Sequence, residues 1–353
     1  EPTQRYSLSK IFLIIVAEPL STPPRVSLWP PIYFVAVCIT KSIPNSIGFR
    51  TTPSIISFTP EGEIFVGREA VDNETYYPET TFRSVKRFMG TNHRFNVYEK
   101  IYSPEELSAE ILKKLKQDAE TFLGESIEGA VITVPAYFNN DQRQSTKIAG
   151  ELAGLKVLRI INEPTAASLS YGLDKSINQT VLVYDLGGGT FDVTILKISD
   201  GMDFHVLSTS GDTNLGGDDF DIAIIKMIAD KCNINISDLS TEQYVRIRDA
   251  AEKAKKDLTF RDSTRINLHY FHFVDDRPQD IRCIITREEF NEKIAPFVDK
   301  TKKCVSSAIF DAGLKFADIN EVVFVGGSTR VPFITEEIKK LTGKNPNKTI
   351  NPD

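Results

Sequence analysis

Three successive glycines between two β-type runs constrain this chain more than any other feature. Gly187, Gly188 and Gly189 separate the apolar, β-branched runs Val181–Leu186 and Phe191–Ile198. Because glycine weakens the interior of a strand, the pattern favours a tight turn between two strands. A turn without Cβ atoms lets backbone N–H groups surround an anion such as a phosphate. A plain glycine-rich hairpin turn is the alternative interpretation.

Two carboxylates and a hydroxyl flank this turn. Asp185 precedes it, Asp192 follows it, and Thr190 lies at its end. Carboxylates beside a phosphate would repel it unless a hard cation lies between them, and Mg²⁺ suits oxygen ligands and water. The pattern is neither a P-loop nor a dinucleotide-binding GxGxxG motif, because a strand and not a helix follows the glycines.

The bulk composition excludes several classes of protein. With 353 residues, 25% of them charged and 41% hydrophobic, the chain has the composition of a soluble globular protein of one large or two medium domains. Its net charge of −6 argues against a nucleic-acid partner. The four cysteines and four histidines show no metal-type spacing. The apolar run Ile11–Ala17 is far too short for a membrane span.

The chain changes character near Lys41. Residues 1–40 are rich in proline and show no sustained period, and only Ile32–Ile39 suggests a strand. Beyond them, elements alternate regularly. The expected strands are Ser54–Phe58, Ile64–Val66, the two runs of the hairpin, Ala130–Val134, Val157–Ile161 and Glu321–Val325; the expected helices are Pro104 to Gly124, Asp141–Leu152, Thr241–Leu258, and Pro332 to Gly343. This mixture predicts an α/β architecture of more than one lobe.

The clearest helix start is Ser103-Pro104-Glu105-Glu106. It is a capping box with proline at the first helical position. One side of the helix is expected to be apolar and buried, and consists of Leu107, Ile111, Leu112, Leu115 and Phe122.

Two further clusters lie in the second half of the sequence. Glu252, Lys255 and Thr259 fall on one face of a helix and could bind a ligand together, or form a solvated charged face. Gly326-Gly327-Ser328-Thr329-Arg330 follows a strand, where ligands bind in open α/β sheets. The glycine pair permits close approach to a flat ring, which Arg330 could stack on, whereas an ordinary strand-to-helix loop is the alternative.

Two single residues in the first half also deserve a functional interpretation. Lys86 lies between apolar residues in Ser84–Phe88, which suggests a side chain pointing into a cleft to pair with a phosphate. A common surface lysine is the alternative. Glu163 precedes Pro164 at a helix start, where it is either a site carboxylate or a cap.

Taken together, these motifs resemble the nucleotide-binding domain of the DnaK-type, seventy-kilodalton heat-shock chaperones. The resemblance runs from about Lys41 to Asp353, nearly nine-tenths of the chain. The segments that carry it are Arg50–Ser54, Val131–Phe138, Gln142–Gln144, Ile161–Ala167, Asp185–Asp192, Gly211–Thr213, Leu215–Gly217, Glu252–Lys255, Gly326–Arg330 and Asn351–Asp353. It implies an actin-like ATPase fold, with two lobes of two subdomains each around a cleft for ATP and Mg²⁺. The lobes are expected at residues 41–172, incomplete, and 173–353.

The resemblance also assigns roles to the residues around the phosphates. Gly187–Thr190 would be the second phosphate loop, and Gly216 and Gly217 would lie against the nucleotide. Asp185 and Asp192, with Glu163, would hold Mg²⁺ through waters and orient the attacking water. Lys86 would stabilise the transferring γ-phosphate.

A second group of residues would contact the nucleoside or transmit its state. Contact with the ribose and adenine is implied for Glu252, Lys255, Thr259, Gly326, Gly327, Ser328, Arg330 and Asp353. Pro135 and Arg143 match the proline and arginine that relay the nucleotide state to a peptide-binding domain. Thr259 replaces a usual serine and keeps the hydroxyl.

The chain departs from the family pattern in two places. Residues 1–40 contain no Asp-x-Gly, so the first phosphate loop and the central strand of the first lobe are expected to be missing. Losing one side of the cradle predicts a rate loss of about 10²–10³, roughly two to four kcal/mol. Between Gly90 and Ser103 the chain is also about two dozen residues shorter than the family, which removes a pair of outer strands.

The resulting interpretation is the ATPase module of a chaperone that assists protein folding. The expected partners are a J-domain co-chaperone and a nucleotide-exchange factor, with unfolded polypeptide bound only through a peptide-binding domain that this chain lacks. A catalytically impaired or non-enzymatic relic that binds nucleotide or co-chaperones is the alternative. A sugar or acetate kinase of the same fold is disfavoured, because no substrate base is found. Phe82–Phe88 and Leu207–Asp212 resemble bacterial and plastid members, which suggests a plastid or the cytoplasm.

Overall fold

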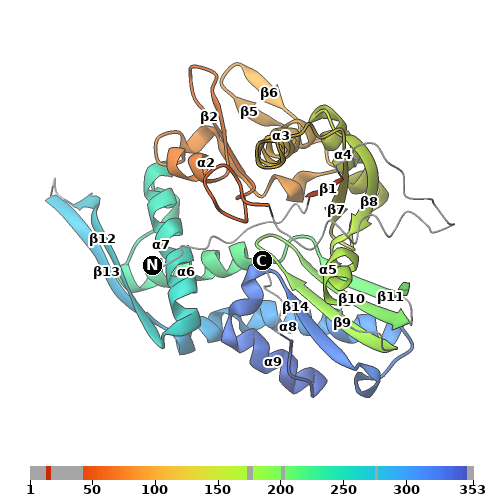
Figure 1. Cartoon of the computed structure of the whole chain (residues 1–353). Coiled ribbons are helices and arrows are strands. Elements are labelled where there is room, and N and C mark those ends of the chain that lie inside the picture. Colours follow the sequence, from red (N-terminus) through yellow and green to blue (C-terminus); the bar gives the residue numbers. More distant parts are fainter. Residues whose placement is uncertain (1–12, 17–42, 173–177, 200–202, 275–276, 348–353) are drawn as a thin grey trace.

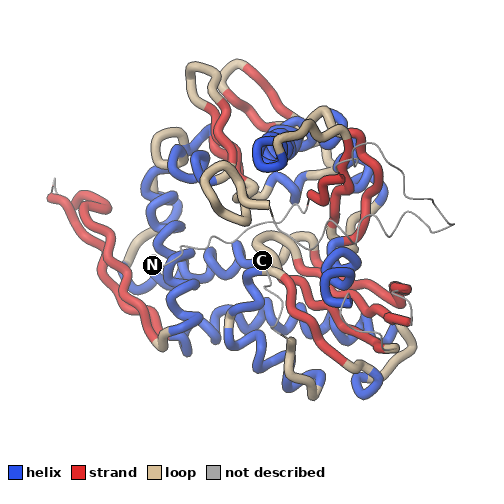
Figure 2. Tube along the Cα trace, viewed as in Figure 1, coloured by secondary structure: helices blue, strands red, loops and turns tan. Residues whose placement is uncertain are grey.

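The structure is a computed structural model, which describes residues 13–16, 43–172, 178–199, 203–274 and 277–347. Figure 1 shows two halves, and Figure 2 shows that each contains both helices and strands. We call the part from β1 to β8 the upper half and the part from β9 to α9 the lower half. The helix α5, Glu163–Gly172, connects them.

The lower half is built on a four-stranded sheet with the order β11-β10-β9-β14. Its strands are β9 (Gln179–Leu186), β10 (Phe191–Ser199), β11 (Asp203–Asp212) and β14 (Glu321–Val325). β9 pairs antiparallel with β10 and parallel with β14. The predicted hairpin is therefore confirmed, and it lies in the middle of this sheet.

Both faces of this sheet are covered. Leu182, Tyr184 and Leu186 belong to a large core that includes residues of the helices α6 (Gly217–Cys232), α8 (Arg287–Asp311) and α9 (Pro332–Thr342). On the other face, Val181 and Val183 belong to a smaller cluster against which Ala167 of α5 packs. A strand that is buried on both faces has a continuous apolar sequence. This explains the apolar runs on each side of the three glycines.

A long helix and a two-stranded sheet complete the lower half. The helix α7 spans Thr241–Phe260, close to its predicted bounds, and β12 (Ser263–Val274) pairs antiparallel with β13 (Arg277–Thr286). Ser240 caps α7 and accepts a hydrogen bond from the backbone N–H of Gln243 at 3.2 Å.

The described residues of the upper half form three small sheets. The first contains β2 (Ile55–Phe58), β3 (Ile64–Val66) and β4 (Thr81–Arg83); the second contains β1 (Leu13–Val16), β7 (Gly129–Val134) and β8 (Lys156–Asn162); the third contains β5 (Phe95–Val97) and β6 (Lys100–Tyr102). The helices are α2 (Arg68–Asn73), α3 (Pro104–Leu123) and α4 (Asn140–Leu152). The strands and helices predicted in this half are thus present, with bounds shifted by one residue or two.

Four described strands of the upper half, β1, β4, β5 and β6, were not predicted. β1 pairs antiparallel with β7, although the sequence around it showed no strand period. Four apolar residues are too few for a periodic signal. The strand is formed by its pairing with β7, which the local sequence does not reveal. β5 and β6 form a hairpin within the shortened segment before Ser103. The possible strand Ile32–Ile39 lies outside the described residues.

Helix α3 follows its sequence signals closely. Ser103 accepts a hydrogen bond from the backbone N–H of Glu106, whose side chain accepts one from the backbone N–H of Ser103. Gly124 ends the helix with φ of 73°. The expected burial of Phe122 is wrong: the residue is 58% exposed and lies in the last turn of the helix, whose last buried residue is Ala119.

Replacing Ser103 by alanine is expected to lower the free energy of unfolding by about 1 kcal/mol, because it removes one half of the capping box. Thermal unfolding followed by circular dichroism measures the effect. Ser306→Ala is the matched control, since Ser306 is exposed within α8 and its hydroxyl only donates to the Lys302 carbonyl at 2.9 Å. Equal melting temperatures for the two variants would contradict the prediction.

Among the described residues, no helix is long and apolar enough to span a membrane.

Candidate functional site

The glycine turn after β9 lies against a second glycine pair from the start of α6. The Gly187 N–H donates to the Thr190 carbonyl at 3.1 Å, which closes the turn. The Gly217 N–H donates to the Gly187 carbonyl at 2.9 Å, and the Asp218 N–H donates to the Gly188 carbonyl at 2.8 Å. Two segments about thirty residues apart in sequence therefore form one backbone surface, where the N-terminus of α6 packs against the glycine turn.

The close packing depends on glycine at Gly216 more than at Gly187. A Cβ atom on Gly216 would lie 2.3 Å from the Gly188 carbonyl oxygen, a distance that real atoms do not adopt. A Cβ atom on Gly187 would meet only the Thr190 carbonyl oxygen at 3.7 Å, an ordinary contact. A Cβ atom on Gly189 would lie 2.9 Å from the Arg87 Nε atom, so packing in this structure requires glycine at Gly189 and Gly216 but not at Gly187. Close approach of an anion to the three glycines stays a prediction.

Three buried carboxylates lie beside the turn. Asp185 and Asp192 face each other across β9 and β10, and Glu163 begins α5. Burial, together with the charges of Glu163 and Asp185, raises the pKa of Asp192 to about 8. The Tyr137 N–H donates to Asp192 at 3.0 Å and acts in the opposite direction. A cluster of this kind favours a positive charge beside it.

No group of three or more His, Cys, Asp or Glu side chains in the described part of the chain is placed as direct ligands of one metal ion. The predicted coordination through waters is a different arrangement, and the carboxylate oxygens have the hard character that Mg²⁺ prefers. Three buried carboxylates next to one another, Asp185, Asp192 and Glu163, are the observation that fits a cation at this place.

Lys86 reaches this cluster from the upper half. It lies in the short 3₁₀ turn Val85–Phe88, and its Nζ atom is 2.5 Å from an oxygen of Glu163. The side chains of Lys86 and Glu163 are only 11% and 5% exposed. The ammonium also lies 5.8 Å from the centre of the Phe138 ring. The alternative of a common surface lysine is therefore wrong.

The predicted cluster on α7 is buried rather than solvated. The Lys255 ammonium donates to Asp221 at 2.6 Å and to the Gly217 carbonyl at 2.9 Å. Glu252 accepts from Lys256 at 2.7 Å, and the Thr259 hydroxyl donates to its own helix, at the Lys255 carbonyl. The alternative of a solvated charged face is wrong for Glu252 and Lys255. Lys255 also links α7 to the glycine pair of α6.

Asp221 was not predicted as a site residue. Burial, followed by the charges of Glu252 and Asp218, raises its pKa to about 6, although the charge of Lys255 lowers it. One carboxylate oxygen of Asp221 is buried and has no hydrogen-bond partner. The sequence offered little signal, because Asp221 is one of four acidic or aromatic residues in a row after Gly217.

The loop after β14 adjoins the glycine turn. The Ser328 hydroxyl donates to the Gly187 carbonyl at 2.8 Å. Gly326 has φ of 89°, and a Cβ atom there would lie 2.2 Å from the Leu186 carbonyl oxygen. Gly327–Arg330 then forms a short 3₁₀ turn in which Arg330 is half-buried. The loop thus follows a strand, as predicted from the sequence. Asp353 lies outside the described residues.

Arg87 is a second residue that the sequence reasoning missed. Its Nε atom donates to the Gly189 carbonyl at 2.9 Å, and its guanidinium lies 3.4 Å from Asp219. Ser84 donates to Asp218 at 2.7 Å nearby. The upper half therefore contacts both glycine segments of the lower half. In the sequence, Arg87 was marked only by its position next to Lys86.

Pro135 and Arg143, the two residues assigned to signal relay, lie at the loop that contacts Asp192. Arg143 donates to the carbonyls of Phe138 and Ala136 at 2.9 and 3.1 Å and to the Asn162 side chain at 2.8 Å. These bonds fix the loop that begins at Pro135 and carries Tyr137, whose N–H binds Asp192. The geometry connects the loop to the site, and the relay itself stays a prediction.

A cavity of about 210 Å³ opens between the halves next to this site. Its lining includes Ser84, Asp218, Asp221, Arg248 and Glu252. The arrangement as a whole offers the glycine turn and Lys86 for an anion, the carboxylates of Asp185, Asp192 and Glu163 for a cation, and the buried side chains of Glu252 and Lys255 on α7. These are the groups that a nucleoside polyphosphate with a divalent metal requires.

Comparison with families of known proteins agrees with this chemistry. The family model described as Hsp70 protein matches residues 35–353. The match begins six residues before Lys41 and includes all the described residues of both halves except β1.

Proposed function

The chain belongs to the Hsp70 family, and from this membership we propose that it is an ATP-binding and ATP-hydrolysing chaperone domain of the DnaK type. The family has the actin-like ATPase fold and binds ATP or ADP with Mg²⁺, and the α/β architecture described above is consistent with it. The observation that carries the proposal is the meeting of Lys86, Glu163 and Asp192 beside the glycine turn.

We assign the phosphate end of the nucleotide to the two glycine segments. Backbone N–H groups of Gly188–Thr190 would face the phosphates, and Lys86 would approach the γ-phosphate. Gly216 and Gly217, whose own N–H groups bond to Asp219 and to the Gly187 carbonyl, would lie against this loop. Asp185, Asp192 and Glu163 would hold Mg²⁺ through waters. The bound metal would supply charge neutralisation of the phosphates. Because phosphoryl transfer needs little covalent chemistry, positioning and charge stabilisation by these residues account for the rate.

We assign the nucleoside end to α7 and the loop after β14. Glu252 and Lys255 would donate to or accept from the ribose hydroxyls, with Asp221 holding the Lys255 ammonium in place at 2.6 Å. Thr259, Gly326, Gly327, Ser328 and Arg330 would contact the adenine. Asp353 is included by resemblance alone.

The wider role of the chain follows from the family and is part of the proposal. A J-domain protein and a nucleotide-exchange factor are the partners that Hsp70 proteins generally work with. We propose that the nucleotide state is relayed through Pro135 and Arg143 to a peptide-binding domain, and that the compartment is a plastid or the cytoplasm. Client peptides would be bound by that other domain.

A second candidate is a domain that binds nucleotide weakly without turning it over. The observation in its favour is the sequence of residues 1–40, which contains no aspartate and so no Asp-x-Gly phosphate loop. Both candidates place the nucleotide in the same cleft and differ in the rate of hydrolysis.

Calorimetric titration with ATP and with ADP, each with Mg²⁺ and with EDTA, tests the proposal. Tight binding that depends on Mg²⁺ is expected, followed by release of labelled phosphate in a single-turnover experiment. Binding without phosphate release would favour the second candidate. Absence of binding under all four conditions would overturn both.

A further inference from the structure

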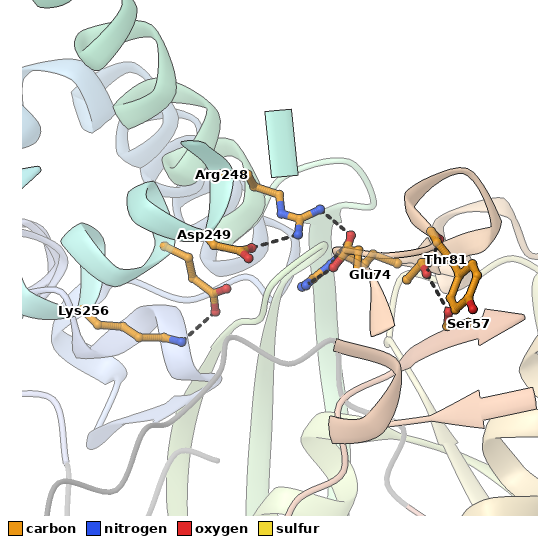
Figure 3. Close-up of polar contacts among 9 residues, drawn as sticks. Ser57, Glu74, Thr81, Arg248, Asp249 and Lys256 are labelled. Atoms are coloured by element: carbon orange, nitrogen blue, oxygen red, sulfur yellow. Dashed lines mark hydrogen bonds and ion pairs between the residues drawn. The ribbon is translucent and has the colours of Figure 1, made fainter. Parts of the chain in front are cut away.

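Glu74 lies where the two halves meet, outside the site described above. It follows α2 in the upper half, its side chain is only 4% exposed, and Figure 3 shows it facing Arg248 of α7. Arg248 Nη1 donates to Glu74 Oε1 at 2.5 Å. Arg83 of β4 donates to Glu74 Oε2 from Nε at 2.9 Å and from Nη2 at 2.5 Å. One buried carboxylate therefore joins an arginine of each half through charge-assisted hydrogen bonds.

Glu74 carries the charge opposite to that of both arginines. Burial opposes the ionisation of Glu74, but its hydrogen bonds and charge interactions with Arg83 and Arg248 outweigh burial and lower its pKa. The bond to Glu74 likewise raises the pKa of Arg248 despite its burial. Arg248 also donates to Asp249 at 2.8 Å. Removing one partner would leave a buried charge without compensation, which is costly.

The contact is placed to control the nucleoside end of the site. Arg248 and Glu252 are four residues apart on α7, so they lie one turn apart on the same side of the helix. Both line the cavity of about 210 Å³ between the halves. Because α7 is continuous from Thr241 to Phe260, holding Arg248 against the upper half also fixes Glu252 and Lys255 relative to Lys86.

A second contact between α7 and the upper half is weaker. The Thr241 hydroxyl at the start of α7 donates to Glu79 at 2.5 Å, but both residues are exposed or near the surface. An exposed hydrogen bond competes with water and adds little. Glu74 provides a buried contact between α7 and the segment from α2 to β4.

We propose that Glu74 is a positioning residue that clasps α7 to the upper half and thereby slows release of the bound nucleotide. The inference rests on the proposed function for the identity of the ligand. A nucleotide held between two halves leaves when they separate, and separation must break the Glu74–Arg248 bond. The clasp acts on release and leaves the phosphate chemistry at Lys86 and Asp192 unchanged.

Glu74→Gln tests the clasp, because it keeps the volume and removes the charge. Dissociation of a fluorescent ADP analogue is expected to accelerate about 10- to 100-fold, the usual result of truncating one partner of a buried charge pair. Single-turnover hydrolysis of bound ATP should stay within about threefold of the parent, a split that general destabilisation would not produce. Arg248→Gln should have the same effect on both rates. The variant that combines Glu74→Gln with Arg248→Gln should release nucleotide little faster than either single variant.

Arg246→Gln is the matched control on the same helix. The Arg246 guanidinium donates to the His269 carbonyl at 2.6 Å, within the lower half, so this change should leave release unaltered. Arg248→Lys keeps the positive charge and loses the planar guanidinium with its several donors, and an intermediate rate of nucleotide release is expected. This milder variant keeps the test available if Glu74→Gln unfolds.

A measurement without nucleotide separates this inference from the proposed function. Spin labels attached through unnatural amino acids at positions 61 and 242, both exposed, report the separation of the halves. Glu74→Gln should lengthen or broaden the distance distribution. If the parent chain binds no nucleotide, the proposed function fails and an unchanged distribution overturns the clasp as well. If it does bind, a release rate within about twofold of the parent overturns the inference.

Discussion

Replacing Lys86 by alanine is expected to slow ATP hydrolysis about 10³-fold and to change ATP affinity by less than about tenfold. The ammonium is the cation that reaches the carboxylate cluster from the upper half, 2.5 Å from Glu163. In the proposed reaction it leaves Glu163 for the γ-phosphate, whose charge is redistributed in the transition state. A group that acts mainly on the transition state affects the rate more than binding. Single-turnover phosphate release and calorimetric titration measure the two quantities.

Two further variants complete this experiment. Lys86→Gln retains a hydrogen-bond donor toward the buried Glu163 and loses only the charge, so it separates loss of catalysis from loss of folding. Lys113→Ala is the control, since Lys113 pairs with Glu110 on the exposed face of α3. Hydrolysis by Lys86→Ala within about threefold of the parent would remove Lys86 from the mechanism.

The elements that could be predicted are those whose signals are local. The two apolar runs around Gly187–Gly189 specify β9 and β10 by composition alone, and Ser103 with Gly124 fixes both ends of α3. Each signal acts over a few residues and does not depend on the rest of the fold. Phe122 shows the limit: it lies on the apolar side of α3, but its burial depends on whether neighbours reach the last turn.

The contacts that could not be predicted join segments far apart in the chain. Lys86 pairs with Glu163, Ser84 with Asp218, and Glu74 with Arg248. A charged residue gives the same local signal whether it faces water or a partner 174 positions away. Lys86 and Glu163 were found because they belong to family motifs, whereas Glu74 and Arg248 carry no such mark. β1 was missed for the related reason that its partner β7 lies more than a hundred residues further on.

The glycines illustrate the same distinction within one site. From the sequence, Gly187–Gly189 is the conspicuous group, because three glycines interrupt a strand pattern. The structure assigns the tightest contacts to Gly216, against the Gly188 carbonyl, and to Gly326, against the Leu186 carbonyl. Neither could be identified locally as a packing glycine, because in each case the obstructing atom comes from β9 or its turn.

Replacing Gly326 by alanine is expected to lower the free energy of unfolding by about 3 kcal/mol or more and to abolish measurable nucleotide binding. The residue has φ of 89°, and its Cβ atom would lie 2.2 Å from the Leu186 carbonyl oxygen and 2.8 Å from Asp185. Both obstacles lie in β9, the middle of the lower sheet, so neither the strand nor the loop can move aside cheaply. Displacing the loop would also move Ser328, which donates to the Gly187 carbonyl at 2.8 Å.

Gly343→Ala isolates the contribution of the clash. Gly343 ends α9 with φ of 69°, yet nothing lies within 4 Å of a Cβ atom placed there. Its replacement should therefore show only the cost of a left-handed alanine, about 1 kcal/mol. Urea unfolding followed by circular dichroism gives the two free energies, and titration with ATP gives the affinities. If Gly326→Ala is no less stable than Gly343→Ala and binds ATP as the parent does, the loop after β14 neither packs as described nor contributes to the nucleotide site.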